Sequence, residues 1–511
     1  MTNQEQVIAD IAREVVARLR IQLQQGQPAS APASATAAPN YSAAHDGVFV
    51  TVDEAARAAN IAQKRVQEMS LEDRGRMIKI VRRICIDRSE ELGRMELEES
   101  KVGRLDHKIQ KLKNMQYVLG IEAMRSDARS DTSGLLIIER APWGVIGMVL
   151  PVTHSVPTMA ANAINILAAG NTAVFAPHPS AKRVAQYALQ LFNREIEREL
   201  GVANTLTTIL EPSIEAADQI FQHPEIALLC VTGGPVVVKA AGKYGKRVIA
   251  AGPGNPPVVV DETADLDRAA ESIIAGAAFD NNLLCIGEKE IFVVASVADK
   301  FIHAMQRAGA FELDAGQIER LTRAAFTFDG DGKGCVRAHV KKDFVGKDVA
   351  VLAAAAGVRA PANTQLLFGE TDEDHPFVVE EQMMPFVPVV RVRDVDEAIA
   401  AAVKAEHGYR HTAIIHTQNV ETATRMARAI NTTKTLRPRR AWRAPSIPRS
   451  LFTTRLRRPR WAWAVRGISV TALQRLPAKA SPRRSPSRAS GRWSSAMRCG
   501  SCRRSSEAAR D

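Results

Sequence analysis

One cysteine stands between a polar Asn-Asn pair and an apolar run, in the segment FDNNLLCIGEKEIFVV of residues 279–294. A cysteine thiolate is a strong nucleophile, and backbone N–H groups at the end of a helix or strand favour the thiolate when they point at the sulfur. The segment therefore makes Cys285 a candidate nucleophile. A lone cysteine is also a common buried apolar residue, so the choice depends on its neighbours.

A second candidate site is the turn after the apolar run ALLCV of residues 227–231. The turn reads Thr-Gly-Gly-Pro, residues 232–235. Glycines after a strand leave backbone N–H groups exposed, and such groups can bind the pyrophosphate of a dinucleotide. A Gly-Gly pair is also a common plain turn, and the usual GxGxxG fingerprint is missing, so both interpretations stay open.

An ordered set of motifs surrounds these residues. They are RAPWGVIGMVLPVTHSVPTMAANAINILAAGNTAVFAPHPSAK (140–182), LLCVTGGP (228–235), VIAAGPGNPPVVVDETADL (248–266), VVEEQMMPFVPVVRV (378–392) and EHGYRHTAIIHTQN (406–419). Together they resemble the aldehyde dehydrogenase superfamily over about residues 47–433. More closely, they resemble the CoA-acylating propionaldehyde and acetaldehyde dehydrogenases of bacterial microcompartments, which act in propanediol and ethanolamine degradation.

The resemblance implies how a nicotinamide cofactor is held. The adenosine end of NAD would lie after the strand NTAVFAP, and the phosphates beside the Gly-Gly turn. Glu381 would hold the nicotinamide ribose, which suits a carboxylate that accepts both ribose hydroxyls; a solvated loop acid is the alternative. Preference for NAD over NADP is implied by resemblance alone. The cofactor residues so implied, besides Glu381, are Thr153, His178, Pro179, Ser180, Thr232, Gly233 and Gly234.

The segment AAGPGNPP, residues 250–257, contains no acidic residue. In hydrolytic aldehyde dehydrogenases this segment carries a glutamate that activates water to cleave the thioester. Without that base, a thiol is the better acyl acceptor near neutral pH. The missing acid therefore favours transfer of the acyl group to coenzyme A as co-substrate.

The mechanism predicted from these residues has two halves. The Cys285 thiolate attacks an aldehyde to give a thiohemiacetal, hydride transfer to NAD leaves a thioester, and CoA takes the acyl group. The oxyanion needs the Cys285 backbone N–H and a second donor. Relatives have an asparagine there, whereas this chain has the turn PVTHSVPT, in which His154 takes about that place. A turn histidine without a role is the alternative.

The elements that must position these residues alternate along the chain. Helical patterns at residues 51–69 and 70–99, the second with Ser70 as N-cap, alternate with short apolar strands, which predicts an α/β fold with largely parallel sheets. The predicted strands are GLLIIER, GVIGMVLPV, NTAVFAP, ALLCVTG, KRVIAAG and PPVVVDE. By resemblance, residues 47–248 form a Rossmann-type NAD-binding domain with a bridging or oligomerisation strand near 133–141. Residues 249–433 form an α/β catalytic domain, and the chain forms a dimer or tetramer.

Residues 1–23 predict an amphipathic helix, and the Ala/Pro/Ser/Gln-rich residues 24–46 predict a flexible linker. A tethered helix with an apolar stripe needs a surface to cover. By resemblance it is an encapsulation peptide that docks to microcompartment shell proteins, inside a compartment of the bacterial cytoplasm. The alternative is a helix that folds back on its own domain.

The end of the chain differs in composition. Residues 431–511 hold nineteen Arg, two Lys, one Glu and one Asp, a net charge of +19, so the first 430 residues carry −7 of the total of +12. Such a tail could bind nucleic acid. It lacks helical or strand periodicity and the Gly-rich end of the resembled family, so we expect residues 434–511 to be a frameshifted reading and no nucleic acid to be bound.

Composition excludes several further classes. The 511 residues are 46% hydrophobic and contain six irregularly spaced cysteines, which indicates a large core and reduced thiols. We read no signal peptide and no membrane span. We predict no metal site, because DGDGKG (329–334) lacks the ligands of a calcium loop and CGSC (499–502) has no second pair. The remaining alternatives are a hydrolytic dehydrogenase and an inactive cargo protein.

Overall fold

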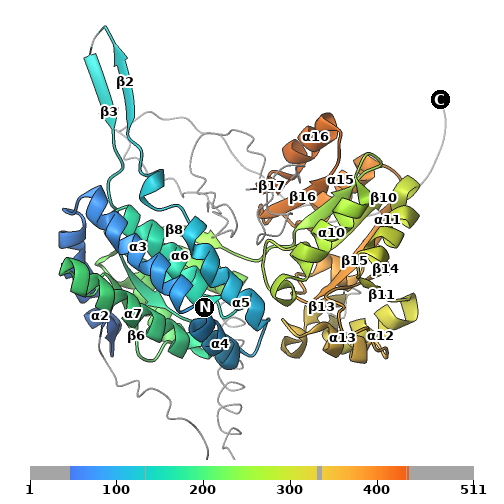
Figure 1. Ribbon diagram of the computed structural model, residues 1–511, viewed down its shortest axis with the longest axis horizontal. Helices are drawn as coiled ribbons and strands as arrows, with labels where there is room; N and C mark the ends of the chain where they lie inside the picture. The colour runs from blue at the N-terminus through green and yellow to red at the C-terminus, as the bar shows by residue number, and fades with distance from the viewer. Residues whose placement is uncertain (1–45, 133, 331–335, 433, 437–511) are drawn as a thin grey trace, which may run out of the picture. The chain divides into compact units, whose positions relative to one another are not determined.

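The computed structural model describes residues 46–436, except for residues 133, 331–335 and 433 (Figure 1). The predicted N-terminal helix, its linker up to residue 45, Cys335, CGSC and the Arg-rich residues from 437 onward lie outside the described residues.

Six parallel strands form the first sheet, in the order β1-β6-β5-β4-β7-β8. Their apolar side chains alternate between two cores, so that Ile146 and Met148 enter one core while Val145 enters the other. The sheet is therefore buried on both faces, as the continuous apolar runs predict. The strands are β1 Val48–Phe49, β4 Val145–Val149, β5 Thr172–Ala176, β6 Leu206–Ile209, β7 Ile226–Thr232 and β8 Arg247–Ala251.

Amphipathic helices cover both faces of this sheet. The Ser70 hydroxyl caps α3 by accepting the Asp73 N–H at 3.1 Å, which confirms the predicted N-cap. The single helix expected over 70–99 is wrong, because the chain leaves helical geometry at Arg88 (φ −102°, ψ 16°). The helices are α2 Val52–Val66, α3 Leu71–Asp87, α4 Ser89–Ser100, α5 Leu105–Lys113, α6 Ser155–Ala168, α7 Lys182–Leu200, α8 Ile214–Gln222 and α9 Pro235–Ala241.

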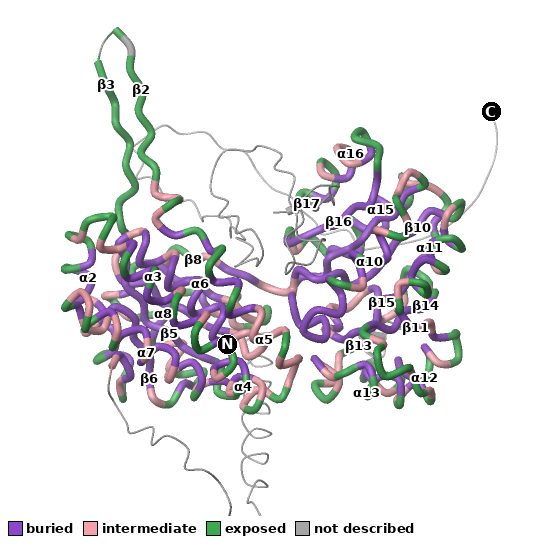
Figure 2. Tube along the Cα trace, viewed as in Figure 1, coloured by how far each residue is buried: buried purple, intermediate pink, exposed green. Residues whose placement is uncertain are grey.

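The strands β2 Asp127–Asp131 and β3 Gly134–Ile138 form an antiparallel hairpin, which extends away from the helices that cover the first sheet. It contains the run GLLIIER, which is a strand as predicted. Figure 2 shows β3 exposed along its length, and the four apolar side chains of residues 135–138 are between 43% and 67% exposed. None of these four side chains packs into a hydrophobic core of the described residues.

Seven parallel strands form the second sheet, in the order β11-β14-β15-β10-β9-β16-β17. The strands are β9 Pro257–Val260, β10 Glu290–Val294, β11 Phe311–Glu312, β14 Leu367–Thr371, β15 Phe386–Val392, β16 Thr412–His416 and β17 Lys434–Leu436. A separate hairpin joins β12 Phe326–Gly330 to β13 Val336–Val340. The helices are α10 Leu266–Ala277, α11 Ala295–Arg307, α12 Ala315–Ala325, α13 Val349–Ala355, α14 Pro376–Val379, α15 Val395–Ala405 and α16 Val420–Ile430.

Short 3₁₀ turns complete the path: η1 Asn114–Tyr117, η2 Ile121–Ala123, η3 Pro179–Ala181, η4 Gly242–Tyr244, η5 Phe279–Asn282 and η6 Lys342–Phe344. The two sheets confirm the predicted α/β fold, in which antiparallel pairing is confined to the two hairpins among the described strands. The boundaries predicted at 248 and 433 stay predictions. β8 continues the first sheet to Ala251, and β17 continues the second to Leu436. Among the described helices, none is both long and apolar enough to cross a membrane.

Candidate active site

The predicted nucleophile follows a turn with unusual backbone geometry. Asp280, Asn281 and Asn282 have φ angles of 51°, 56° and 61°, which is the left-handed region. Each such residue costs about 1–2 kcal/mol relative to helical geometry, so surrounding contacts must hold the turn. Asn281 Nδ2 donates to Gly346 O at 3.0 Å and to Asp348 Oδ1 at 2.8 Å. The turn brings the partly exposed Cys285 to the start of β10.

A fully buried lysine holds the same turn from inside. The Lys289 ammonium donates to Asn282 O and Oδ1, both at 2.6 Å, and to Leu284 O at 3.2 Å. Burial lowers the pKa of Lys289 to about 8, against the negative charges of Glu381 and the Cys285 thiolate, which raise it. By reciprocity, the ammonium favours the thiolate form of Cys285. Sequence analysis missed Lys289, although a lysine between two glutamates at the start of an apolar strand was a usable signal.

The acid-free segment lies directly against the nucleophile. A Cβ added to Gly254 would come within 2.6 Å of Cys285 O and 2.9 Å of the His411 ring. Only glycine fits between these two groups. The neighbouring Asn255 points elsewhere, since its amide donates to Val378 O and Ala405 O at 2.9 and 3.1 Å. The segment that carries no acid therefore lies beside the Cys285 backbone carbonyl.

Glu381 belongs to this same group of residues. Burial raises the pKa of its carboxyl group to about 6, while Lys289 and the Gly254 N–H, which donates to the carboxylate, act to lower it. At neutral pH the carboxylate is ionised and can accept hydroxyl groups. That chemistry suits the predicted ribose contact, which stays a prediction.

His411 is a second residue that sequence analysis missed. Its ring is buried, and Nδ1 is 2.8 Å from the Thr412 hydroxyl. Its backbone N–H donates to Glu406 Oε1 at 2.7 Å, and burial raises the pKa of Glu406. The motif EHGYRHT contains both residues, but only the fold brings the His411 ring to Gly254, beside the Cys285 carbonyl.

His154 is the N-cap residue of α6, in the loop that follows β4. Burial and the charge of Lys111 lower the pKa of His154 to about 3; Asp280 opposes this effect and Lys108 adds to it. The imidazole is therefore neutral and keeps one N–H to donate. Nδ1 is buried without a hydrogen-bond partner among the described residues, as expected for a group that awaits a ligand.

We expect His154→Ala to slow thioester formation about 10²–10³-fold, because removing an oxyanion donor costs that much. The side chain makes no capping hydrogen bond to α6, so the helix keeps its start. The measurement is the pre-steady-state burst of NADH, with His303→Ala on the exposed face of α11 as control. A loss of less than about tenfold would refute the role.

The predicted cofactor residues other than Glu381 follow strands of the first sheet, whereas Glu381 lies with Lys289 and Gly254. Strand order reverses between β4 and β7, and the segments after β4, β5 and β7 carry Thr153, residues 178–180 and residues 232–234. Dinucleotides bind at such a switch point, beyond the carboxyl ends of parallel strands. The Thr153 carbonyl accepts hydrogen bonds from Lys108 and Lys111, so the contacts of this residue involve its backbone oxygen.

The first sheet's edge fits a dinucleotide in two respects. The Thr232 hydroxyl is buried without a partner in the described part of the chain, and nothing within 4 Å would meet a Cβ at Gly234. His178 is exposed; its Nδ1 accepts the Ser180 N–H at 3.1 Å, and partial burial and the charge of Lys342 lower its pKa. No group of three or more metal-ligating side chains occurs among the described residues.

Comparison with known proteins places this geometry in a family. The model of the aldehyde dehydrogenase family matches residues 27–326. The acetaldehyde dehydrogenase (acetylating) EutE of Salmonella typhimurium is 45% identical over 389 residues, which are 76% of this chain and 82% of that protein.

Solved structures agree with the sequence match. One is propionaldehyde dehydrogenase from Rhodopseudomonas palustris with bound CoA and an acylated cysteine, at 39% identity and a TM-score of 0.73, covering 77% of this chain and 89% of that one. Another, from the fucose utilisation microcompartment of Clostridium phytofermentans, has 38% identity, a TM-score of 0.73 and the same coverage. The fold, the cysteine turn and these matches together show that the chain belongs to the aldehyde dehydrogenase family.

Proposed function

We propose that this protein oxidises a short-chain aldehyde such as propionaldehyde, acetaldehyde or lactaldehyde with NAD⁺ and CoA, giving acyl-CoA, NADH and a proton. One observation carries the proposal: Gly254 of the segment 250–257 lies beside the Cys285 backbone carbonyl, and this segment contains no carboxylate that could activate water. The names of the acetylating relative and of the CoA-bound structure support the same acceptor.

The first half of the reaction forms the thioester. The Cys285 thiolate, favoured by the Lys289 ammonium, adds to the aldehyde carbon, and the carbonyl oxygen becomes an oxyanion. The Cys285 backbone N–H and the neutral His154 imidazole donate to that oxyanion. Bound NAD⁺ supplies the hydride acceptor. The thiohemiacetal carbon then becomes the carbonyl carbon of the thioester on Cys285.

The second half returns the thiolate. The CoA sulfur attacks the thioester carbon, the bond to Cys285 Sγ breaks, and acyl-CoA leaves. The CoA thiol must lose its proton before or during this attack. His411, whose ring lies against Gly254 beside the Cys285 backbone, is the imidazole that we propose receives it.

The experiment follows NADH absorbance with purified protein, NAD⁺ and propionaldehyde, with and without CoA. We expect sustained turnover only with CoA, and about one NADH per active site without it, because the thioester then persists. Equal sustained rates with and without CoA would contradict acyl transfer and favour a hydrolytic dehydrogenase.

Absence of NADH in both reactions would favour the alternative of a catalytically impaired cargo protein. Residues 434–511, which we propose are a frameshifted reading, would then be the suspected cause of the lost activity. Sequencing the gene across codon 434 distinguishes the two explanations. A shifted reading frame would account for the lack of activity, whereas an intact frame would indicate that Cys285 is not the nucleophile.

We further propose that residues 1–23 dock this enzyme to shell proteins of a bacterial microcompartment in the cytoplasm. The microcompartment origin of the C. phytofermentans structure supports this location. The exposed apolar side chains of β3 (residues 135–138) support a homo-oligomer, a dimer or tetramer, in which this hairpin is covered.

A further inference from the structure

Helix α5 carries two lysines whose side chains are almost completely removed from solvent. Lys108 and Lys111 are each 1% exposed, and each faces an equally buried acid. Lys108 Nζ lies 3.3 Å from Glu96 Oε1, and Lys111 Nζ lies 2.5 Å from Asp280 Oδ2. Even when each charge is paired, a buried ion pair often adds little to stability compared with apolar residues of the same size.

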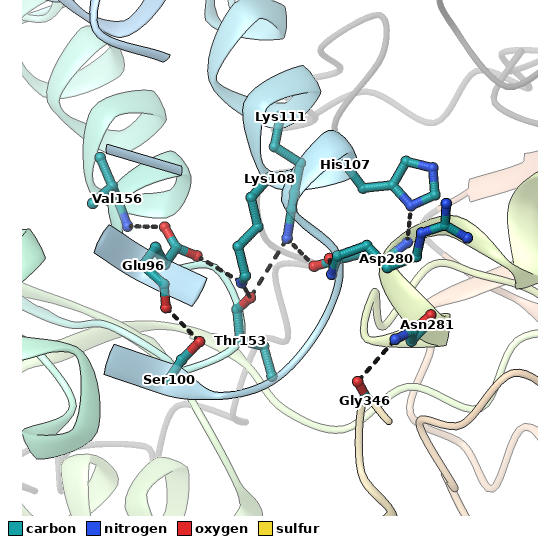
Figure 3. Close-up of polar contacts among 11 residues, drawn as sticks. Glu96, Ser100, His107, Lys108, Lys111, Thr153, Val156, Asp280, Asn281 and Gly346 are labelled. Carbon is teal, nitrogen blue, oxygen red and sulfur yellow. Dashed lines mark hydrogen bonds and ion pairs between the residues drawn. The ribbon is translucent and has the colours of Figure 1, made fainter. Parts of the chain in front are cut away.

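The two lysines share one further acceptor. Both ammonium groups lie 3.5 Å from Thr153 O, the carbonyl immediately before His154 (Figure 3). Glu96 Oε2 also accepts the Val156 N–H at 3.3 Å. The buried charges on α4 and α5 therefore hold the backbone on both sides of His154.

The same helix holds the turn before Cys285. Asp280 Oδ1 accepts the Arg104 N–H at 2.7 Å, and the Asp280 N–H donates to His107 Nδ1 at 2.8 Å. The His107 ring stacks on Phe279 with centroids 4.4 Å apart. These contacts fix Asp280 in its left-handed conformation (φ 51°).

We infer that Lys111 is a positioning residue for thioester formation. Its ammonium joins the turn that presents Cys285, through Asp280, to the loop that presents His154, through Thr153 O. One cation thereby sets the distance between the nucleophile and the second oxyanion donor. The inference rests on the proposed function, since that function gives His154 its role.

The charges around this lysine agree with the same role. Burial acts to raise the pKa of Asp280, but Lys111 and Lys108 bring it below its usual range, so that the carboxylate stays ionised. Both lysines also help to keep His154 neutral. A neutral side chain at position 111 would lose the tie to Asp280 and the contact to Thr153 O together.

The test compares Lys111→Met with the charge-neutral pair Lys111→Met/Asp280→Asn. The exposed Lys113→Met on the same helix is the matched control. The pair leaves no unpaired charge buried, so its melting temperature should recover toward that of the wild type. We expect the NADH burst to stay about 10–100-fold slower in both variants, because a displacement of about 1 Å costs that much.

Alkylation of Cys285 by iodoacetamide, followed by peptide mass spectrometry, gives a second reading that needs neither NAD⁺ nor CoA. We expect its rate to change at least about threefold in both variants and to stay unchanged in Lys113→Met. If the chain gives no NADH at all, the proposed function fails while this reading still tests the position of the thiol.

Two results would overturn the inference. One is that Lys111→Met/Asp280→Asn shows the burst and alkylation rates of the wild type. Restored stability would then be enough to restore both rates, and the ammonium would have no positioning role. The other is loss of the folded state in both variants, since the lysine would then serve folding alone.

Discussion

Replacing Cys285 by alanine is expected to reduce NADH formation by about 10⁴-fold or more, because no covalent intermediate can form without the sulfur. The turn that presents it is held by Asn281, Asn282 and Lys289, none of which depends on the thiol for the contacts described above. The variant should therefore melt close to the wild type. The measurement is the NADH burst and steady state with propionaldehyde and CoA.

The matched control is Cys85→Ala. Cys85 is completely buried in α3, and burial raises the pKa of its thiol far above the usual value. The same substitution there should cost stability through a small cavity but leave the burst per folded molecule unchanged. If Cys285→Ala kept more than about 1% of the wild-type burst, the nucleophile would have to be sought elsewhere.

Replacing Lys289 by methionine is expected to slow thioester formation about 10³–10⁵-fold at neutral pH. Loss of the cation removes the charge that favours the Cys285 thiolate, which is worth about 1–3 pKa units for a close pair. Loss of the three hydrogen bonds to Asn282 and Leu284 also frees the strained turn, at a cost of about 10²-fold. The rate of Cys285 alkylation, measured against pH, should shift to higher pH.

The pH dependence of the free energy of unfolding should also differ between the wild type and Lys289→Met. Because burial holds the pKa of Lys289 at about 8, below the usual lysine value of 10.5, the unfolded chain binds a proton that the folded protein has released between these pH values. Wild-type stability therefore gains from this group as pH rises from about 8 to about 10.5, and the gain is absent in Lys289→Met. Urea unfolding of both proteins across that range measures the difference.

The exposed Lys300→Met in α11 is the control for both readings. An unchanged alkylation profile in Lys289→Met would show that the ammonium does not act on the thiol. If the free energy of unfolding varied with pH in the same way in the wild type and in Lys289→Met, a lowered pKa of Lys289 in the folded protein would be contradicted.

Several parts of the site could be predicted because their signals are local. The predicted runs are strands and Ser70 caps its helix, as short-range patterns of polarity indicated. The acid-free segment was visible in the chain for the same reason. The break at Arg88 was missed because two helices in succession keep the same apolar spacing on either side of it.

By itself, the sequence determined the α/β class, the identity of Cys285 as candidate nucleophile and the family, since strand runs, turn residues and ordered motifs are properties of neighbours along the chain. Only the tertiary structure decided which side chains lie around that cysteine and its turn. Lys111 and Asp280 are 169 residues apart, and His411 meets the Cys285 turn across Gly254. Such pairs form where parallel strands and their connecting helices pack together, and the spacing of residues within one element carries no information about that packing.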